Sequence, residues 1–171
     1  MNYLINYADG AFAESRRKNS ISGLNAGFDS VVQYGPQDID TLFYEKNKEI
    51  LTQKRGAGYW LWKPYFIFQT LKNLKEGDTV FYSDSGAEFI KLVEPLLDLI
   101  QEKEVVGFKL SGNHKEGQYT RKAVIEKLGL NPTETAPINQ DAASFIGVKK
   151  TQHTGEEDHV IGTWLDLCQD R

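Results

Sequence analysis

The sequence predicts a three-layer α/β domain with a mainly parallel central sheet. Short runs of β-branched and aromatic residues alternate with helical stretches along the whole chain. The run at 79–82 consists of β-branched and aromatic residues, as expected of a buried central strand. Strands that are joined through helices run parallel, so the helices are expected to cover both faces of a Rossmann-like sheet.

Length and composition indicate one ordinary globular domain over residues 1–171. The hydrophobic fraction of 40% exceeds that of disordered chains, and the net charge of -4 argues against a nucleic-acid partner. No stretch approaches the roughly 20 apolar residues of a membrane span. Cys168 is the only cysteine, which excludes an internal disulfide and predicts a cytoplasmic location.

The first elements follow from local pattern. An apolar run over Asn2–Tyr7 predicts the first strand, which ends at Ala8, Asp9 and Gly10. A helix is expected over 11–26, where Gly27 suits the helix end, and a second strand over 29–34. The next helix is predicted over 42–54, with four buried positions: Leu42, Phe43, Ile50 and Leu51.

A glycine-containing break at 55–58 separates this region from the centre of the chain. Pro64 suits the first turn of a helix over 65–74, and the strand at 79–82 then delivers Ser83, Asp84 and Ser85 to its carboxyl end. Further helices are expected over 90–101, 120–128 and 156–169, and further strands over 105–110 and 143–149. The polar stretch 111–118 is predicted to be a surface loop.

Asp84 is the first candidate for a functional residue. Ligands of such sheets bind outside the carboxyl ends of the strands, and a carboxylate there suits a divalent cation. Two interpretations stay open on local sequence, because Asp-Ser-Gly is also ordinary turn chemistry. Glu88 is the nearest second carboxylate, and it suits either a metal shell or a solvated position before the next helix.

Two motifs carry a resemblance to a known family. Residues 55–64 read RGAGYWLWKP and residues 81–87 read FYSDSGA. They resemble a group of GT-A-fold glycosyltransferases found in bacterial polysaccharide loci and large viruses, and a weaker likeness runs from Asn139 to Trp164. The resemblance implies a nucleotide-diphospho-sugar transferase that uses a nucleoside-diphosphate sugar, with uridine as the expected base.

The resemblance also implies roles for residues. Its metal-binding Asp-x-Asp motif reads Asp84-Ser85-Gly86 here, so Mn²⁺ or Mg²⁺ would rest on Asp84 with the diphosphate and water. Residues 7–9 would face the base and ribose, and an ordinary core position is the open alternative for Tyr7. The donor-site residues expected on this basis are Tyr7, Ala8, Asp9, Arg55, Lys63, Ser83, Asp84 and Ser85. Arg55 and Lys63 suit the diphosphate, and pairing with an acid is the alternative role for either.

The acceptor is expected to be a glycan or a lipid-linked sugar. An inverting transferase needs a carboxylate to take the acceptor proton, and Asp141, before the strand at 143–149, is the candidate. The open alternative is that residues 139–141 form an ordinary polar loop. The chain ends at Arg171, earlier than the relatives suggested by the motifs, which implies a C-terminally short domain.

Two other classes remain open. The glycine in place of the second acid favours a non-catalytic nucleotide-sugar-binding module. A phosphatase of the haloacid-dehalogenase type is a weaker alternative, because it requires an acid where Gly86 stands.

Overall fold

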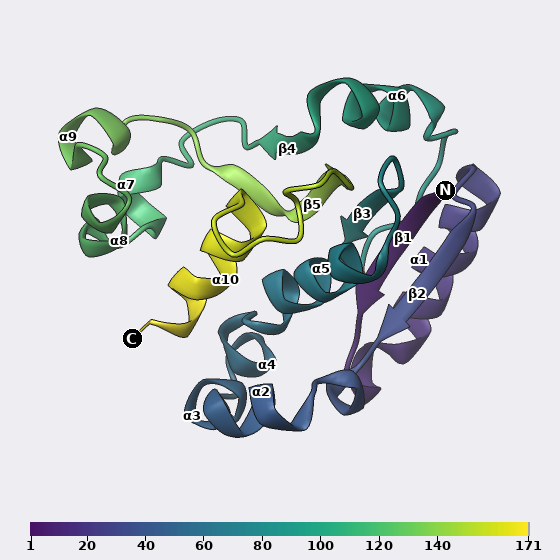
Figure 1. The fold of residues 1–171 in the computed structure, drawn as a ribbon, viewed down its shortest axis with the longest axis horizontal. Helices are drawn as coiled ribbons and strands as arrows, with labels where there is room; N and C mark the ends of the chain where they lie inside the picture. The colour runs from purple at the N-terminus through teal and green to yellow at the C-terminus, as the bar shows by residue number, and fades with distance from the viewer. Residues whose placement is uncertain (171) are drawn as a thin grey trace. The chain divides into compact units, whose positions relative to one another are not determined.

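The computed structural model describes residues 1–170 (Figure 1). Its contacts divide the chain into two compact units. The first unit consists of Met1–Val106 together with the segment that begins at Ile146, and the second consists of Gly107–Phe145. The prediction of a single domain over 1–171 stays a prediction.

A five-stranded sheet confirms the predicted α/β class. The strands lie in the order β2-β1-β3-β5-β4, and β1 runs parallel to both β2 and β3. Hydrogen bonds from Lys149 N to Glu104 O and from Leu110 N to Gln140 O join opposite ends of β4 and β5, so these two strands run antiparallel. Their bounds are β1 Asn2–Tyr7, β2 Ser30–Tyr34, β3 Thr79–Ser83, β4 Val105–Lys109 and β5 Asp141–Lys149.

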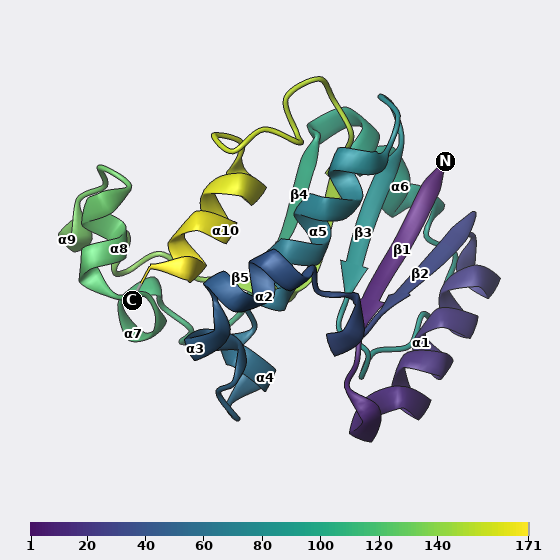
Figure 2. The same cartoon turned by 60° about the horizontal axis from the view of Figure 1, so that its bottom comes forward.

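Neighbouring residues of β1 and β3 point to opposite faces of the sheet, as the pleat requires. Leu4 lies opposite Phe81 and Ile5 lies opposite Tyr82 in the register. Helix α1 (Ala13–Ala26) covers the Leu4 face, where a Cβ added to Gly23 would lie 2.2 Å from the Leu4 side chain. Helix α5 (Trp62–Asn73) covers the Ile5 face, and Figure 2 shows these two helices on either side of β1 and β3.

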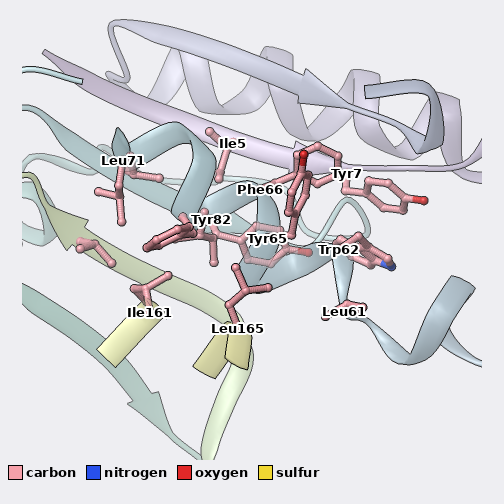
Figure 3. Close-up of a cluster of buried hydrophobic side chains, with 14 of the residues drawn as sticks. Ile5, Tyr7, Leu61, Trp62, Tyr65, Phe66, Leu71, Tyr82, Ile161 and Leu165 are labelled. Carbon is pink, nitrogen blue, oxygen red and sulfur yellow. The ribbon is translucent and has the colours of Figure 1, made fainter. Parts of the chain in front are cut away.

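The main core lies on the α5 side of the sheet. Trp62 to Phe68 are all buried, which explains why α5 reads as almost continuously apolar. Helix α10 (Val160–Gln169) adds Ile161 and Leu165 to the same cluster (Figure 3). The helices predicted over 65–74 and 156–169 are therefore confirmed, although both have shifted ends.

The predicted helix 42–54 is wrong in its extent. Two short helices, α2 (Thr41–Lys46) and α3 (Lys48–Leu51), flank a break at Asn47, whose side chain donates to the Phe43 carbonyl and closes α2. Within α2, Phe43 faces the core and the adjacent Leu42 is 81% exposed, so Leu42 was wrongly predicted to be buried, whereas Ile50 is buried as predicted.

Helix α6 (Glu94–Lys103) begins four residues later than predicted. Pro95 occupies its first turn, and Ile90 and Leu92 precede it in an exposed loop. In the second unit, α8 (Lys122–Lys127) matches the predicted helix at 120–128. Two further short helices there, α7 (Glu116–Tyr119) and α9 (Pro132–Thr135), were not predicted.

No helix in residues 1–170 has both the length and the apolar composition that crossing a bilayer requires.

The segment labelled α4 (Gly56–Tyr59) is a left-handed turn. Five consecutive residues, from Gly56 to Trp60, have positive φ, including Ala57 at 47°, Tyr59 at 50° and Trp60 at 59°. This conformation costs an L-residue about 1–2 kcal/mol. At Gly58 the chain also passes so close to α3 that an added Cβ would lie 2.7 Å from the Leu51 Cα.

We predict that Gly58→Ala lowers the free energy of unfolding by about 3 kcal/mol, because backbone strain and a backbone clash add together. Gly77→Ala is the matched control, since Gly77 has a similar φ of 86° but open space around its Cα. The control should lose about 1 kcal/mol. Denaturant unfolding measures both, and equal losses would contradict the close packing of this turn on α3.

We also predict that His159 makes stability depend on pH. Burial lowers the pKa of His159 from its usual 6.5, against the opposing effect of Glu104. Its neutral Nδ1 lies 3.4 Å from the Ile161 N–H at the start of α10. The unfolded chain binds the proton first, so stability should fall as pH drops below about 6.5. Melting curves from pH 7.5 to 5.5 should show a smaller decline for His159→Asn, and parallel declines would refute this role.

Candidate functional site

A cavity of about 400 Å³ lies at the carboxyl ends of β1 and β3. The chain leaves β1 for β2 on one side and later returns to β3 on the other, so the cavity sits where the strand order reverses. Such a switch point is the standard ligand crevice of an open parallel sheet. Five of the predicted donor-site residues line it: Tyr7, Ala8, Asp9, Asp84 and Ser85.

A hydrogen bond ties the two strand ends together. The buried Ser85 hydroxyl donates to the Tyr7 carbonyl at 2.5 Å, which joins the loop after β3 to the end of β1. The Tyr7 ring stacks on Trp62, with centroids 3.9 Å apart and planes 17° apart. Burial, with Asp9 nearby, raises the pKa of Tyr7 to about 12. The phenol therefore stays protonated at neutral pH.

Two hydrogen-bond donors hold the Asp84 carboxylate. Its Oδ1 accepts a hydrogen bond from the Lys63 ammonium at 2.9 Å and another from the Tyr82 hydroxyl at 2.5 Å. Burial and the neighbouring Asp84 raise the pKa of Tyr82 well above its usual value, so Tyr82 remains a donor. The Asp84 side chain is 42% exposed, and the described residues give its Oδ2 no hydrogen bond.

The predicted cations take different places. Lys63 has only 5% of its side chain exposed and lies beside Asp84, over the Tyr82 ring, without lining the cavity. This matches the acid-pairing alternative for Lys63. Arg55 is exposed, lies 5.9 Å from the Trp60 ring centroid and does not line the cavity either. Its neighbour Lys54 does line the cavity. Lys54 was not predicted as a site residue, because it ends the predicted helix 42–54 just outside the motif at 55–64.

A buried polar network lies behind the loop after β3. Asn19 is fully buried, and its amide donates to the Ser83 hydroxyl at 3.0 Å and to the Ala87 carbonyl at 2.9 Å. Asn6, in β1, donates in turn to the Asn19 side chain at 2.7 Å. Ser83 is therefore a buried support of the loop and does not line the cavity. The one available sequence signal was Asn6, a polar residue inside an apolar strand.

Asp141 is the first residue of β5, and the prediction that it precedes the strand is wrong. Its side chain is 61% exposed, and Oδ1 lies 3.6 Å from the Lys109 ammonium in the antiparallel β4–β5 pair. Both residues belong to the second unit. The role of Asp141 as a base stays a prediction.

The chemistry of the donor set indicates how a divalent cation would bind. Residues 1–170 contain no group of three or more His, Cys, Asp or Glu side chains that would form a metal site by themselves. Glu88 is exposed, and Asp9 already accepts a hydrogen bond from the Ala11 N–H. Mg²⁺ commonly binds to one or two carboxylates plus substrate phosphates and water. The open Asp84 Oδ2 fits that shared arrangement.

We predict that Asn19→Ala lowers the free energy of unfolding by about 3 kcal/mol. The substitution removes the donor to the part-buried Ala87 carbonyl and to the buried Ser83 hydroxyl. It also takes away one of the two acceptors of the buried Asn6 amide, which keeps the Ser20 hydroxyl. Asn25→Ala is the control, because Asn25 is an exposed residue of the same helix and should change stability by under about 0.5 kcal/mol. Chemical denaturation of both variants checks this, and comparable losses would argue against the network.

No protein-family model matches the chain, and no curated protein sequence matches it. Among solved structures, the galactosyltransferase LgtC, determined in complex with donor and acceptor sugar analogues, is similar with a TM-score of 0.52 at 13% sequence identity. The match covers 99% of this chain and 66% of that chain, so this chain spans just under two thirds of the length of LgtC. The chain therefore has the GT-A-type three-layer α/β fold that its sequence predicted.

Proposed function

We propose that the cavity binds a nucleoside-diphosphate sugar and that the protein transfers the sugar to a glycan or lipid-linked acceptor. The observation that carries this proposal is the position of Asp84, which lines a cavity at the switch point of a GT-A-type sheet. The motifs at 55–64 and 81–87 support placement with the glycosyltransferases of bacterial polysaccharide loci and large viruses. A cytoplasmic location accompanies this proposal, since nucleotide sugars are its substrates.

Residues of the cavity divide into two chemical groups under this proposal. Tyr7, Ala8 and Asp9 bind the nucleoside, with uridine as the expected base. Lys54 is the lining cation, and it offsets the negative charge of the diphosphate and of the departing nucleotide. Lys63 acts through Asp84, because its ammonium is buried against that carboxylate and fixes its direction.

Asp84 Oδ2 is the atom we assign to a Mn²⁺ or Mg²⁺ ion shared with the diphosphate. When bound, the ion neutralises charge on the leaving nucleotide. Lys63 and Tyr82 both donate to Oδ1, and Asp84 lines the cavity, which leaves Oδ2 for the ion. Since Asp84 is the one protein ligand in this arrangement, we expect the ion to bind together with the nucleotide and hardly at all by itself.

The base that takes the acceptor proton is proposed to be Asp141 if the reaction inverts the sugar. The Asp141 side chain is 61% exposed, so it is accessible to an acceptor hydroxyl, and its carboxylate lies 3.6 Å from the Lys109 ammonium.

A second candidate function is a nucleotide-sugar-binding module without transferase activity. The glycine at position 86 favours it, because the loop offers one carboxylate where two would bind a cation more tightly. Release of free sugar or of nucleoside diphosphate from a nucleotide sugar in the presence of Mn²⁺ separates the two functions. The phosphatase alternative lacks its second acid at the same position.

Thermal unfolding tests the donor site. We predict that one of uridine, guanosine, thymidine and cytidine diphosphate raises the melting temperature. At a concentration of 100 times its Kd, that nucleotide should add about 2.7 kcal/mol to the free energy of unfolding. Mn²⁺ alone should give no shift, and Mn²⁺ with the nucleotide should give a larger shift than the nucleotide does. Asp84→Asn should lose the part that depends on Mn²⁺.

Asp98→Asn is the control, because Asp98 is an exposed carboxylate of α6 outside the cavity lining. Each shift is measured against the melting temperature of the same variant without ligand, which removes the effect of Asp84 on stability. If none of the four nucleotides shifts the wild-type protein, the donor site is refuted.

A further inference from the structure

The left-handed turn from Gly56 to Trp60 forms part of the cavity wall. Gly56, Ala57 and Trp60 line the cavity, and three of the five residues with positive φ carry side chains that disfavour this conformation. Left-handed residues normally occur singly. Consecutive strained residues persist where the surrounding structure enforces them, and such sites concentrate at ligand pockets.

Within the turn, the Trp60 ring packs against the backbone of Gly56. A Cβ added to Gly56 would lie 2.4–2.8 Å from three atoms of the six-membered ring of Trp60, so the ring rests directly on the Gly56 backbone. The Arg55 guanidinium lies 5.9 Å from the ring centroid. Trp60 is nevertheless 45% exposed. One part of the indole is thus held by the turn, while another part is available in the cavity.

Most other aromatic rings of the cavity are already packed. Tyr7 and Trp62 stack on each other and are buried, and Tyr82 is buried beneath Asp84. Phe12, which is 60% exposed, is the other lining aromatic residue with a large open surface. Trp60 differs from Phe12 in that a strained backbone holds it in place.

The chemistry beside Trp60 indicates the part of the ligand that it meets. Two of its neighbours in the wall, Gly56 and Ala57, offer no polar side chain. The lining cation of the same segment is Lys54, which is assigned above to the diphosphate, and Asp84 and Ser85 come from the end of β3. A pyranose needs partners for its hydroxyl groups. A planar base binds through its face and suits an apolar aromatic surface.

We propose that Trp60 is the stacking platform for the base of the bound nucleotide and that the left-handed turn serves to present it. This inference rests on the proposed function, because it names the contact that the donor nucleotide makes in the same cavity.

Isothermal titration tests the platform, with whichever of the four nucleoside diphosphates gives the largest thermal shift. Trp60→Ala should weaken its binding at least tenfold, and Trp60→Phe should retain most of the affinity. Tyr59→Ala is the matched control, because Tyr59 belongs to the same turn, has a similar φ and is 51% exposed but does not line the cavity. Its affinity should stay within twofold of the wild type.

Tryptophan fluorescence gives a second measurement that does not depend on the alanine variant folding. The nucleotide should quench wild-type emission, and the quenching should largely disappear in Trp60→Phe, which keeps Trp62 and Trp164. Inorganic pyrophosphate, which has no base, should produce neither this quenching nor any difference in affinity between the wild type and Trp60→Phe.

The outcomes separate this inference from the proposed function. Nucleotide binding that is unchanged in Trp60→Ala overturns the platform and leaves the donor site standing. Equal losses in Trp60→Ala and Tyr59→Ala also overturn it, because they assign the effect to the turn and not to the ring. If the wild type binds none of the four nucleotides, the donor site and the platform both fail.

Discussion

The parallel pairing of β1 with β3 is the constraint on which the site depends. It brings residues more than 70 positions apart in sequence to one edge of the sheet, where the Ser85 hydroxyl closes on the Tyr7 carbonyl. Leu4 and Ile5 then face two different layers. A slip of one residue would exchange those faces and bury the wrong side chains. The sheet register thus fixes both the core and the cavity.

A buried charge, the Lys63 ammonium, lies next to the carboxyl end of β3. The ammonium of Lys63 is almost fully enclosed, and burial of a charge is tolerated only with a partner. Asp84 supplies that partner, while Tyr82 holds the same oxygen. The arrangement ties α5 to the end of β3. The orientation of the Asp84 carboxylate is thus set by two buried side chains, Lys63 and Tyr82. Asn19 supports the loop after β3 separately.

On the other wall, the backbone itself is strained. The turn at 56–60 carries the exposed aromatic side chains of Tyr59 and Trp60, and close packing of Gly58 on α3 leaves it little room to relax. A rigid wall and a supported carboxylate are what a preorganised ligand site requires. Both derive from residues that lie within or next to the two sequence motifs.

The sequence alone determined the alternation of strands and helices, the buried β3 and the delivery of Asp84 to its carboxyl end, because these depend on local pattern and period. The break at Asn47 was not predicted because it depends on a side-chain hydrogen bond to the Phe43 carbonyl. The start of α6 was placed too early, although Pro95 indicates a first turn at 94–95. Tertiary structure decided which cation lines the cavity: Lys54 does, while Lys63 is paired beneath it and Arg55 lies outside. The positions of these three cations depend on the left-handed turn and on the packing of α5 against β3. Both bring together residues that are far apart in sequence or outside any helical or strand period, so a sequence pattern cannot predict them.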